Sequence, residues 1–192
     1  MHGIARGFLV SLVLAAGCSS DSGGPNVSLR AEGSDPSGDG GLADLVSGVF
    51  EVAGSSIKVR AQTTAATFKA DSLLIVFNLD TDASALTGYT STNPGHVGLG
   101  IDCIVQLGKV APGVQSASVS RWQNGSFAPT LTSQVTVISN GYEATLTLNA
   151  CPELAGGTTL FRVDAFRQLN AVMYTTRQDW LPDPPLPPLQ LR

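Results

Sequence analysis

Residues 135–148 read VTVISNGYEATLTL, two runs of alternating apolar and polar side chains on either side of Asn140-Gly141. Alternation at period two is typical of a β-strand with one buried face. A two-residue Asn-Gly loop fits the type I′ turn of a β-hairpin, because both residues tolerate positive φ. This stretch therefore predicts two antiparallel strands, 135–138 and 144–148, joined by a tight turn at Asn140-Gly141.

The same alternation recurs along most of the chain, in short runs separated by glycine, proline, asparagine and aspartate. No long stretch has apolar side chains at the 3.6-residue spacing of an amphipathic helix. Many short antiparallel strands share a core and hide their edges when they close into a sandwich or a barrel. We predict an all-β domain, an antiparallel β-sandwich. Its strands are expected at residues 46–53, 56–62, 72–80, 98–107, 115–122, 133–139, 143–149 and 158–166.

The beginning of the chain resembles a bacterial export signal. Arg6 precedes a short apolar run, and Leu14-Ala15-Ala16-Gly17-Cys18 resembles the lipobox of lipoproteins. Roughly nine apolar residues are too few to span a bilayer of about 30 Å. We expect residues 1–17 to be a lipoprotein signal peptide and Cys18 to carry the lipid anchor of a cell-envelope protein. Plain secretory cleavage after Ala16 is the alternative. Ser19, rather than Asp, after the cysteine points to the outer membrane if the cell has two.

Composition divides the remainder of the chain into three parts. Residues 18–33 are rich in glycine and serine and are predicted to form a flexible tether. Residues 34–184 contain the alternating runs and are predicted to form the β-sandwich domain. Residues 185–192 are predicted to form an extended, proline-rich tail, because proline is excluded from helix interiors and central strands.

The charge of the chain excludes several classes of partner. Its formal charge of −4 becomes −5 once residues 1–17, which contain Arg6 and no acid, are removed. A negative chain without a basic patch disfavours nucleic acid and anionic membrane surfaces. Membrane attachment is therefore expected to come from the acyl chains alone.

Two cysteines remain besides Cys18. Cys103 and Cys151 can pair as a disulfide, because an exported protein meets oxidising conditions. The alternative is that each is a small buried apolar side chain, since sequence spacing does not decide whether the two α-carbons approach one another.

Acidic turns form the second pattern. Asp80 and Asp82 follow an apolar run and Asp102 precedes another, so their carboxylates are candidate calcium ligands. Ordinary turn chemistry is the alternative, because aspartate accepts hydrogen bonds from backbone amides in turns. A second candidate group comprises Asp35, Asp39 and Asp44. All of these turns are expected at one rim of the sandwich.

The order of these turns resembles a known superfamily. The segments are Asp35-Pro36-Ser37-Gly38-Asp39, Ala43-Asp44-Leu45, Leu79-Asp80-Thr81-Asp82 followed by Thr87-Gly88, Gly100-Ile101-Asp102, and residues 179–184. Together they are similar to the β-sandwich superfamily that contains family 9 carbohydrate-binding modules and DOMON domains. The resemblance spans residues 35–184. It implies a jelly-roll-like sandwich that binds sugars, haem or other small ligands and has no catalytic machinery.

Aromatic side chains are the candidate ligand-binding residues. Sugar rings stack on aromatic faces, and Trp122, Trp180 and Tyr89 lie near turns. Packing in the core or at its rim is the alternative for each of them. Haem would need axial ligands such as His96 and Met173. His96 lies in a turn and is expected to face solvent.

Catalysis is disfavoured. His96 is the only histidine after residue 17, and no Gly-x-Ser-x-Gly elbow or zinc-binding spacing accompanies it. The sequence therefore predicts a non-enzymatic, envelope-anchored module that binds carbohydrate or another small ligand. A structural or adhesive lipoprotein is the alternative, and a hydrolase is a distant third.

Overall fold

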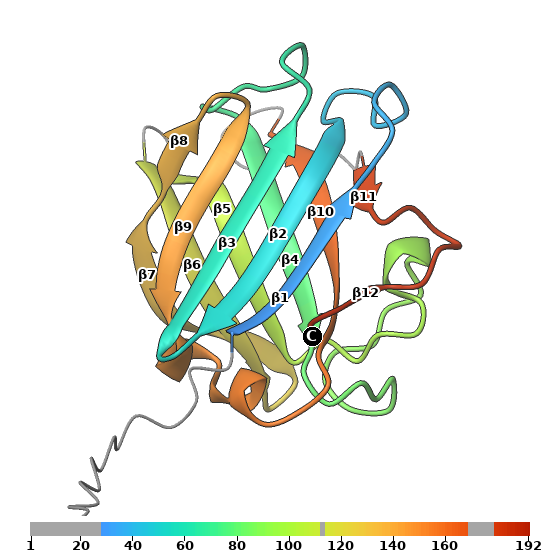
Figure 1. The fold of residues 1–192 in the computed structure, drawn as a ribbon, viewed down its shortest axis with the longest axis vertical. Helices are drawn as coiled ribbons and strands as arrows, with labels where there is room; N and C mark the ends of the chain where they lie inside the picture. Colours follow the sequence, from blue (N-terminus) through green and yellow to red (C-terminus); the bar gives the residue numbers. More distant parts are fainter. Residues whose placement is uncertain (1–27, 112–113, 169–178) are drawn as a thin grey trace, which may run out of the picture.

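Two antiparallel sheets pack face to face in the computed structural model, which describes residues 28–111, 114–168 and 179–192 (Figure 1). The predicted all-β sandwich is confirmed. Sheet A has the order β1-β2-β3-β9-β8, and sheet B has the order β11-β10-β4-β5-β6-β7, with β12 paired to β10. The strands of sheet A are β1 (Ser28–Ser34), β2 (Leu45–Ala53), β3 (Ser56–Thr63), β8 (Thr136–Ile138) and β9 (Gly141–Thr147). Those on sheet B are β4 (Leu73–Asp80), β5 (Cys103–Ala111), β6 (Val114–Gln123), β7 (Ser126–Gln134), β10 (Leu160–Arg167), β11 (Asp179–Leu181) and β12 (Leu189–Gln190).

Helical structure among the described residues is limited to three short 3₁₀ turns: η1 (Pro94–His96), η2 (Leu148–Ala150) and η3 (Pro152–Ala155). None of the helices in the described ranges is long and apolar enough to cross a membrane.

The core lies between the sheets and is centred on three phenylalanines. Phe50 of β2, Phe77 of β4 and Phe161 of β10 are fully buried, with ring centroids 5.6 to 6.2 Å apart. Tilted contacts at this distance suit the ring quadrupoles and add to the gain from burying apolar surface. These residues come from both sheets, so the cluster holds the two layers together.

The hairpin of residues 135–148 forms, but its turn lies one residue earlier than predicted. Ile138 pairs with Gly141, so the loop is Ser139-Asn140, and neither Asn140 nor Gly141 has a positive φ. The predicted type I′ turn at Asn140-Gly141 is therefore wrong. Gly141 is required for another reason: a Cβ at this position would run into the carbonyl oxygen of Ala61 on β3.

A type I′ geometry occurs instead between β6 and β7. Gln123 pairs with Ser126, and the two loop residues Asn124 and Gly125 have φ values of 52° and 81°. Positive φ at both positions is the requirement that asparagine and glycine satisfy with little strain.

Two of the predicted strands have different bounds. The strand expected at 98–107 begins at Cys103, because Ile101 forms an isolated bridge with Tyr89 instead of joining sheet B. The run expected at 133–139 is divided between two strands. β7 ends at Gln134 in sheet B and β8 begins at Thr136 in sheet A, so the chain crosses between the sheets at Val135.

The domain begins earlier than predicted. Residues 28–33 were expected in the tether 18–33, but β1 pairs with β2 over its whole length, from Ser28 opposite Ala53 to Ser34 opposite Ser47. Ala31 is nine-tenths buried and Leu29 packs against the core, so this short strand has its own buried face. The predicted signal peptide, Cys18 and the rest of the tether lie outside the described residues.

The predicted tail 185–192 also belongs to the domain. Leu189–Gln190 pairs with β10, and Leu191 is only 5% exposed. The amide of Arg30 on β1 donates to the carbonyl of Arg192 at 2.7 Å. The end of the chain therefore closes the side of the sandwich between β1 and β10 (Figure 1).

Candidate functional site

The acidic turns lie at two separate places, not at one rim as predicted. Asp179 pairs with Ala165, which pairs with Ile75, whereas Asp80 lies five residues further along β4. At about 3.3 Å per residue, Asp179 and Asp80 are roughly 17 Å apart along the strand direction. The reason is topological, because the turns at 35–44 and 179–183 lie near the opposite ends of their strands from the turns at 80–88 and 100–102.

Three of the predicted ligand residues do meet. One carboxylate oxygen from each of Asp80, Asp82 and Asp102 lies within 4.8 Å of the others. Asp80 is fully buried, and this burial raises the pKa of its carboxyl. Hydrogen bonds from two backbone amides lower that pKa, and the neighbouring Asp82 and Asp102 raise it. The cluster therefore has the proximity that a cation site requires.

The same carboxylates also satisfy the alternative interpretation as turn acids. Asp80 accepts hydrogen bonds from the amides of Ser84 at 3.0 Å and Gly100 at 3.1 Å. One oxygen of Asp102 accepts from both the amide and the hydroxyl of Thr81, each at 2.9 Å. Asp82 accepts from the hydroxyl of Thr87 at 2.9 Å. The geometry is compatible with both interpretations.

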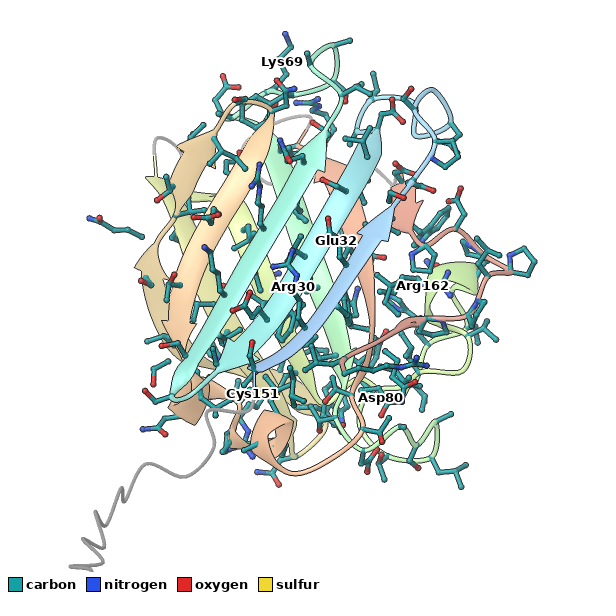
Figure 2. The ribbon with its side chains drawn as sticks, in the orientation of Figure 1. Arg30, Glu32, Lys69, Asp80, Cys151 and Arg162 are labelled. Atoms are coloured by element: carbon teal, nitrogen blue, oxygen red, sulfur yellow. A yellow bond between two sulfur atoms is a disulfide. The ribbon has the colours of Figure 1, made fainter. Side chains whose placement is uncertain are left out.

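Cys103 and Cys151 form a disulfide, with their α-carbons 6.5 Å apart. This is the first of the two alternatives predicted for the pair. The bond joins the start of β5 to the segment between η2 and η3, and it places Asp102 and Glu153 on facing walls. Figure 2 shows Asp80 and Cys151 at the same end of the sandwich, opposite Lys69.

A cleft of about 660 Å³ opens between these walls. This volume is within the range of small-ligand pockets, about 300–1,000 Å³. The residues that line it come from the turn after β4, the ends of β5 and β6, and the loop that precedes β10. They are Thr81, Asp82, Ala83, Asp102, Arg121, Trp122, Glu153, Gly156, Gly157 and Thr158.

Trp122, which lines the cleft, belongs to an aromatic cluster. Trp122 lies opposite Phe127 across the β6–β7 pair, with ring centroids 5.0 Å apart, and Tyr89 lies 5.1 Å from Trp122 and 5.7 Å from Phe127. All three side chains are half-buried. Trp122 and Tyr89, two of the candidate ligand-binding residues, therefore lie side by side, and Trp122 lines the cleft.

Trp180, the third predicted aromatic, lies elsewhere. It belongs to β11, whereas Trp122 belongs to β6, four strand positions away in sheet B. At about 4.8 Å per strand they are roughly 19 Å apart, too far to hold one sugar ring between them. The indole of Trp180 packs against Gly95, where a side chain would collide with it. Trp180 therefore does not lie beside Trp122 and Tyr89.

Two charged residues of the cleft were not predicted. Arg121 and Glu153 form an ion pair across it. Glu153 lies two residues after Cys151, which is bonded to Cys103, and Cys103 pairs with Arg121 across β5 and β6. Spacing in the sequence does not reveal this proximity. Arg121 lies on the same face of β6 as the buried Ala117 and Val119. The alternation along this strand could therefore have indicated that Arg121 faces inward.

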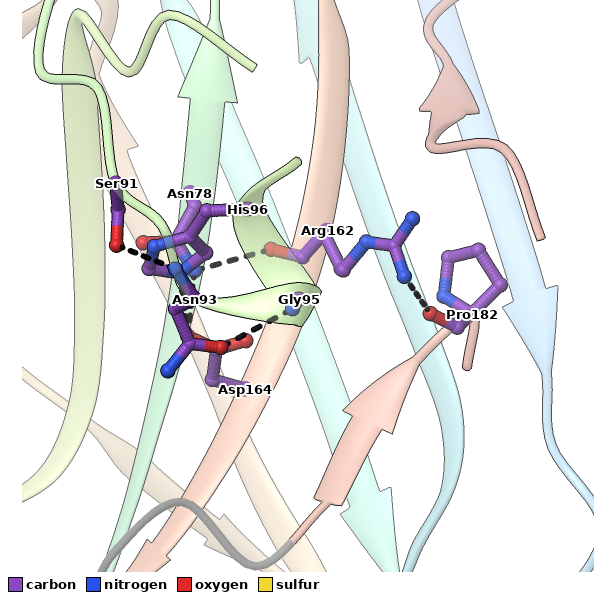
Figure 3. Close-up of polar contacts among 8 residues, drawn as sticks. All are labelled: Asn78, Ser91, Asn93, Gly95, His96, Arg162, Asp164 and Pro182. Carbon is purple, nitrogen blue, oxygen red and sulfur yellow. Dashed lines mark hydrogen bonds and ion pairs between the residues drawn. The ribbon is translucent and has the colours of Figure 1, made fainter. Parts of the chain in front are cut away.

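A buried polar network lies on the outer face of sheet B, over β4 and β10. Asp164 of β10 accepts a hydrogen bond from the Asn78 side-chain amide at 2.9 Å, and Nε2 of His96 lies 3.0 Å from the same oxygen. Figure 3 shows these side chains between β4, β10 and the η1 turn. His96 is only 5% exposed, so the expectation that it faces solvent is wrong. The turn folds back onto the sheet because Asp164, which Asn78 also binds, gives its imidazole a partner.

The C-terminal segment is held over the same face. Arg162 is 3% exposed and donates from its two terminal nitrogens to the carbonyls of Pro182 and Leu186, each at 2.7 Å. With His96 already bound to Asp164, no haem ligand set forms among the described residues, and Met173 lies outside them.

The second group of acids is larger than predicted. Asp35, Asp39 and Asp44 are joined by Asp179 and Asp183. Burial, opposed by its amide donors, raises the pKa of Asp179 to about 7, and burial together with neighbouring carboxylates raises that of Asp35 to about 6. Asp179 accepts from the amides of Leu45 and Trp180, which joins β11 to the start of β2.

No family model, curated protein or solved structure matches this chain. The likeness to family 9 modules and DOMON domains remains a prediction that rests on the acidic turns.

Proposed function

We propose that this chain is a non-catalytic ligand-binding module, attached to the cell envelope through Cys18, and that its ligand is a carbohydrate. The observation that carries the proposal is the cleft of about 660 Å³ that brings Trp122 together with Asp82, Asp102 and Arg121. An aromatic face beside carboxylate and guanidinium groups is the combination that stacks a sugar ring and pairs its hydroxyls.

The contacts that hold the lining residues in place favour a pre-formed site. The disulfide links the segments that contain Asp102 and Glu153, and Tyr89 and Phe127 both pack against the Trp122 ring. Side chains that are already ordered lose less entropy when a ligand binds. The loop at 156–158 adds backbone and hydroxyl groups that can pair with sugar hydroxyls.

The binding test is a calorimetric titration of the purified protein with a panel of soluble oligosaccharides. Binding that is lost in Trp122→Ala and retained in the matched control Trp180→Ala supports the proposal. Silence across the panel contradicts it and favours the structural or adhesive alternative. Analysis of the recovered sugars for cleavage products tests the hydrolase alternative in the same samples.

We further propose that calcium stabilises the turn that contains Asp80, Asp82 and Asp102. The support is the proximity of the three carboxylates. Saturation at one hundred times the dissociation constant would add about 2.7 kcal/mol to the free energy of unfolding. The midpoint of thermal unfolding should then rise by several degrees in calcium relative to chelator. An unchanged midpoint would leave the three residues as turn acids only.

Anchoring is tested by detergent phase partitioning of the protein expressed in a bacterial host. The unmodified chain is expected in the detergent phase and Cys18→Ala in the aqueous phase, because two or more acyl chains give stable membrane attachment. Retention of Cys18→Ala in detergent would contradict acylation at this residue.

A further inference from the structure

We infer that the cleft prefers glycans that carry protonated amino groups over neutral and acidic glycans. This inference rests on the proposed carbohydrate function and names the class of sugar. The observation is the balance of charge among the lining residues, which are three carboxylates and one guanidinium.

The single guanidinium is already neutralised. Arg121 forms an ion pair with Glu153 inside the cleft, so its charge is matched before any ligand enters. Asp82 and Asp102 remain, and neither forms an ion pair with a described residue: Asp102 accepts from the amide and hydroxyl of Thr81, and Asp82 accepts from the amide of Ser84 and the hydroxyl of Thr87 and also hydrogen-bonds the carboxyl of Asp80. With no cation bound, the formal charge of the lining residues is therefore −2, from three acids and one base.

The aromatic wall adds to this preference. An ammonium group near the face of a tryptophan ring is attracted by the ring quadrupole, which no hydroxyl reproduces. Trp122 is half-buried near the end of β6, and its amide donates to the carbonyl of Asp102, the residue before β5, at 2.7 Å. One amino sugar lying on Trp122 thus has a carboxylate within reach.

The opposite preference applies to acidic sugars. A uronate entering the cleft would bring a third unmatched carboxylate toward Asp82 and Asp102, and like charges at short range repel. The whole chain has the same sign, with a formal charge of −4. We therefore expect affinity to fall in the order aminated, neutral, acidic.

The test compares three soluble oligomers of equal length: glucosamine, N-acetylglucosamine and galacturonate. Calorimetric titrations of the full chain are made in mildly acidic buffer, where the sugar amines are protonated, and in chelator, so that no divalent cation shares the two aspartates. The glucosamine oligomer should bind at least about threefold more tightly than the acetylated oligomer, as expected for one or two partly exposed ion pairs. Added salt should reduce this ratio, because it screens charge.

Variants identify the groups responsible. In Asp82→Asn the ratio should fall toward one, since asparagine retains the acceptor for Thr87 but not the charge. The matched control is Asp71→Asn, which removes one exposed acid before the opposite end of β4 and should leave the ratio unchanged.

Three outcomes would overturn the inference. Equal or tighter binding of the acetylated oligomer would refute the preference while leaving the proposed function intact. Glucosamine binding that survives Trp122→Ala would show non-specific charge attraction outside the cleft. Binding of none of the three oligomers, with silence across the neutral panel, would refute the proposed function as well.

Discussion

Removal of the Cys103–Cys151 disulfide should destabilise the domain and disturb the cleft together. The two cysteines are 48 residues apart in sequence. In the chain-entropy account, releasing a loop of this length adds about 14 cal/mol/K to the entropy of the unfolded chain, or about 4 kcal/mol at 25 °C. That is a large fraction of the 5–15 kcal/mol typical of a domain.

The perturbation is the double variant Cys103→Ala/Cys151→Ala, and the matched control is Cys18→Ala, which removes a cysteine outside the pair. Urea unfolding followed by tryptophan fluorescence gives the free energy of unfolding for each protein. The double variant should lose about 4 kcal/mol, equivalent to a midpoint of thermal unfolding lower by roughly 8–16 °C. The control should match the unmodified chain.

Binding provides the second readout. The bond ties the segment before β5, which contains Asp102, to the segment that contains Glu153. Sugar affinity should therefore fall in the double variant even where the protein is still folded. A stability loss below about 1 kcal/mol would refute the reasoning, since the loop would then be constrained by other contacts in the unfolded state.

Three further predictions follow from buried groups. Because the pKa of Asp179 is raised to about 7, the folded state retains a proton that the unfolded chain releases from about pH 4 upward, so stability should fall as pH rises toward 7. Asp179→Asn should remove up to about 3 kcal/mol of this change between about pH 5 and pH 8 in urea unfolding, because about two of the pH units below the raised pKa lie in that window; an unaltered pH profile would contradict it. His96→Ala should cost about 1–3 kcal/mol by the same assay, because it removes a buried partner of Asp164, whereas the exposed neighbour in Val97→Ala should cost less than about 0.5 kcal/mol. Gly141→Ala should destabilise by about 1–3 kcal/mol, because its Cβ meets the neighbouring backbone; a neutral result would show that β3 and β9 can separate freely.

The sheets could be predicted because alternation is a local property. Each run places its apolar residues on one face of its strand. Phe50, Phe77 and Phe161 lie on such faces, and all three are in the core. Turn positions were less predictable. The Asn-Gly signal at 140–141 was one residue out because Gly141 serves the close approach of β3, a contact that only the assembled sheet contains.

The site was predictable only in part, because it is assembled by strand order. Trp122 and Asp82 line one cleft because the turns after β4 and β6 lie at the same end of sheet B. Trp180 belongs to β11 at the far edge, which no local pattern reveals. The burial of His96 likewise depends on a long-range partner, since Asp164 lies 68 residues away.

The most direct test of the cleft uses the two tryptophans of this chain, Trp122 and Trp180. Each gives one indole N–H resonance in a two-dimensional NMR spectrum, and conversion of one to phenylalanine assigns both. During titration with an oligosaccharide that binds, the Trp122 resonance should move in a saturable way while that of Trp180 stays in place. Movement of the Trp180 resonance alone would contradict a sugar site at the end of β6.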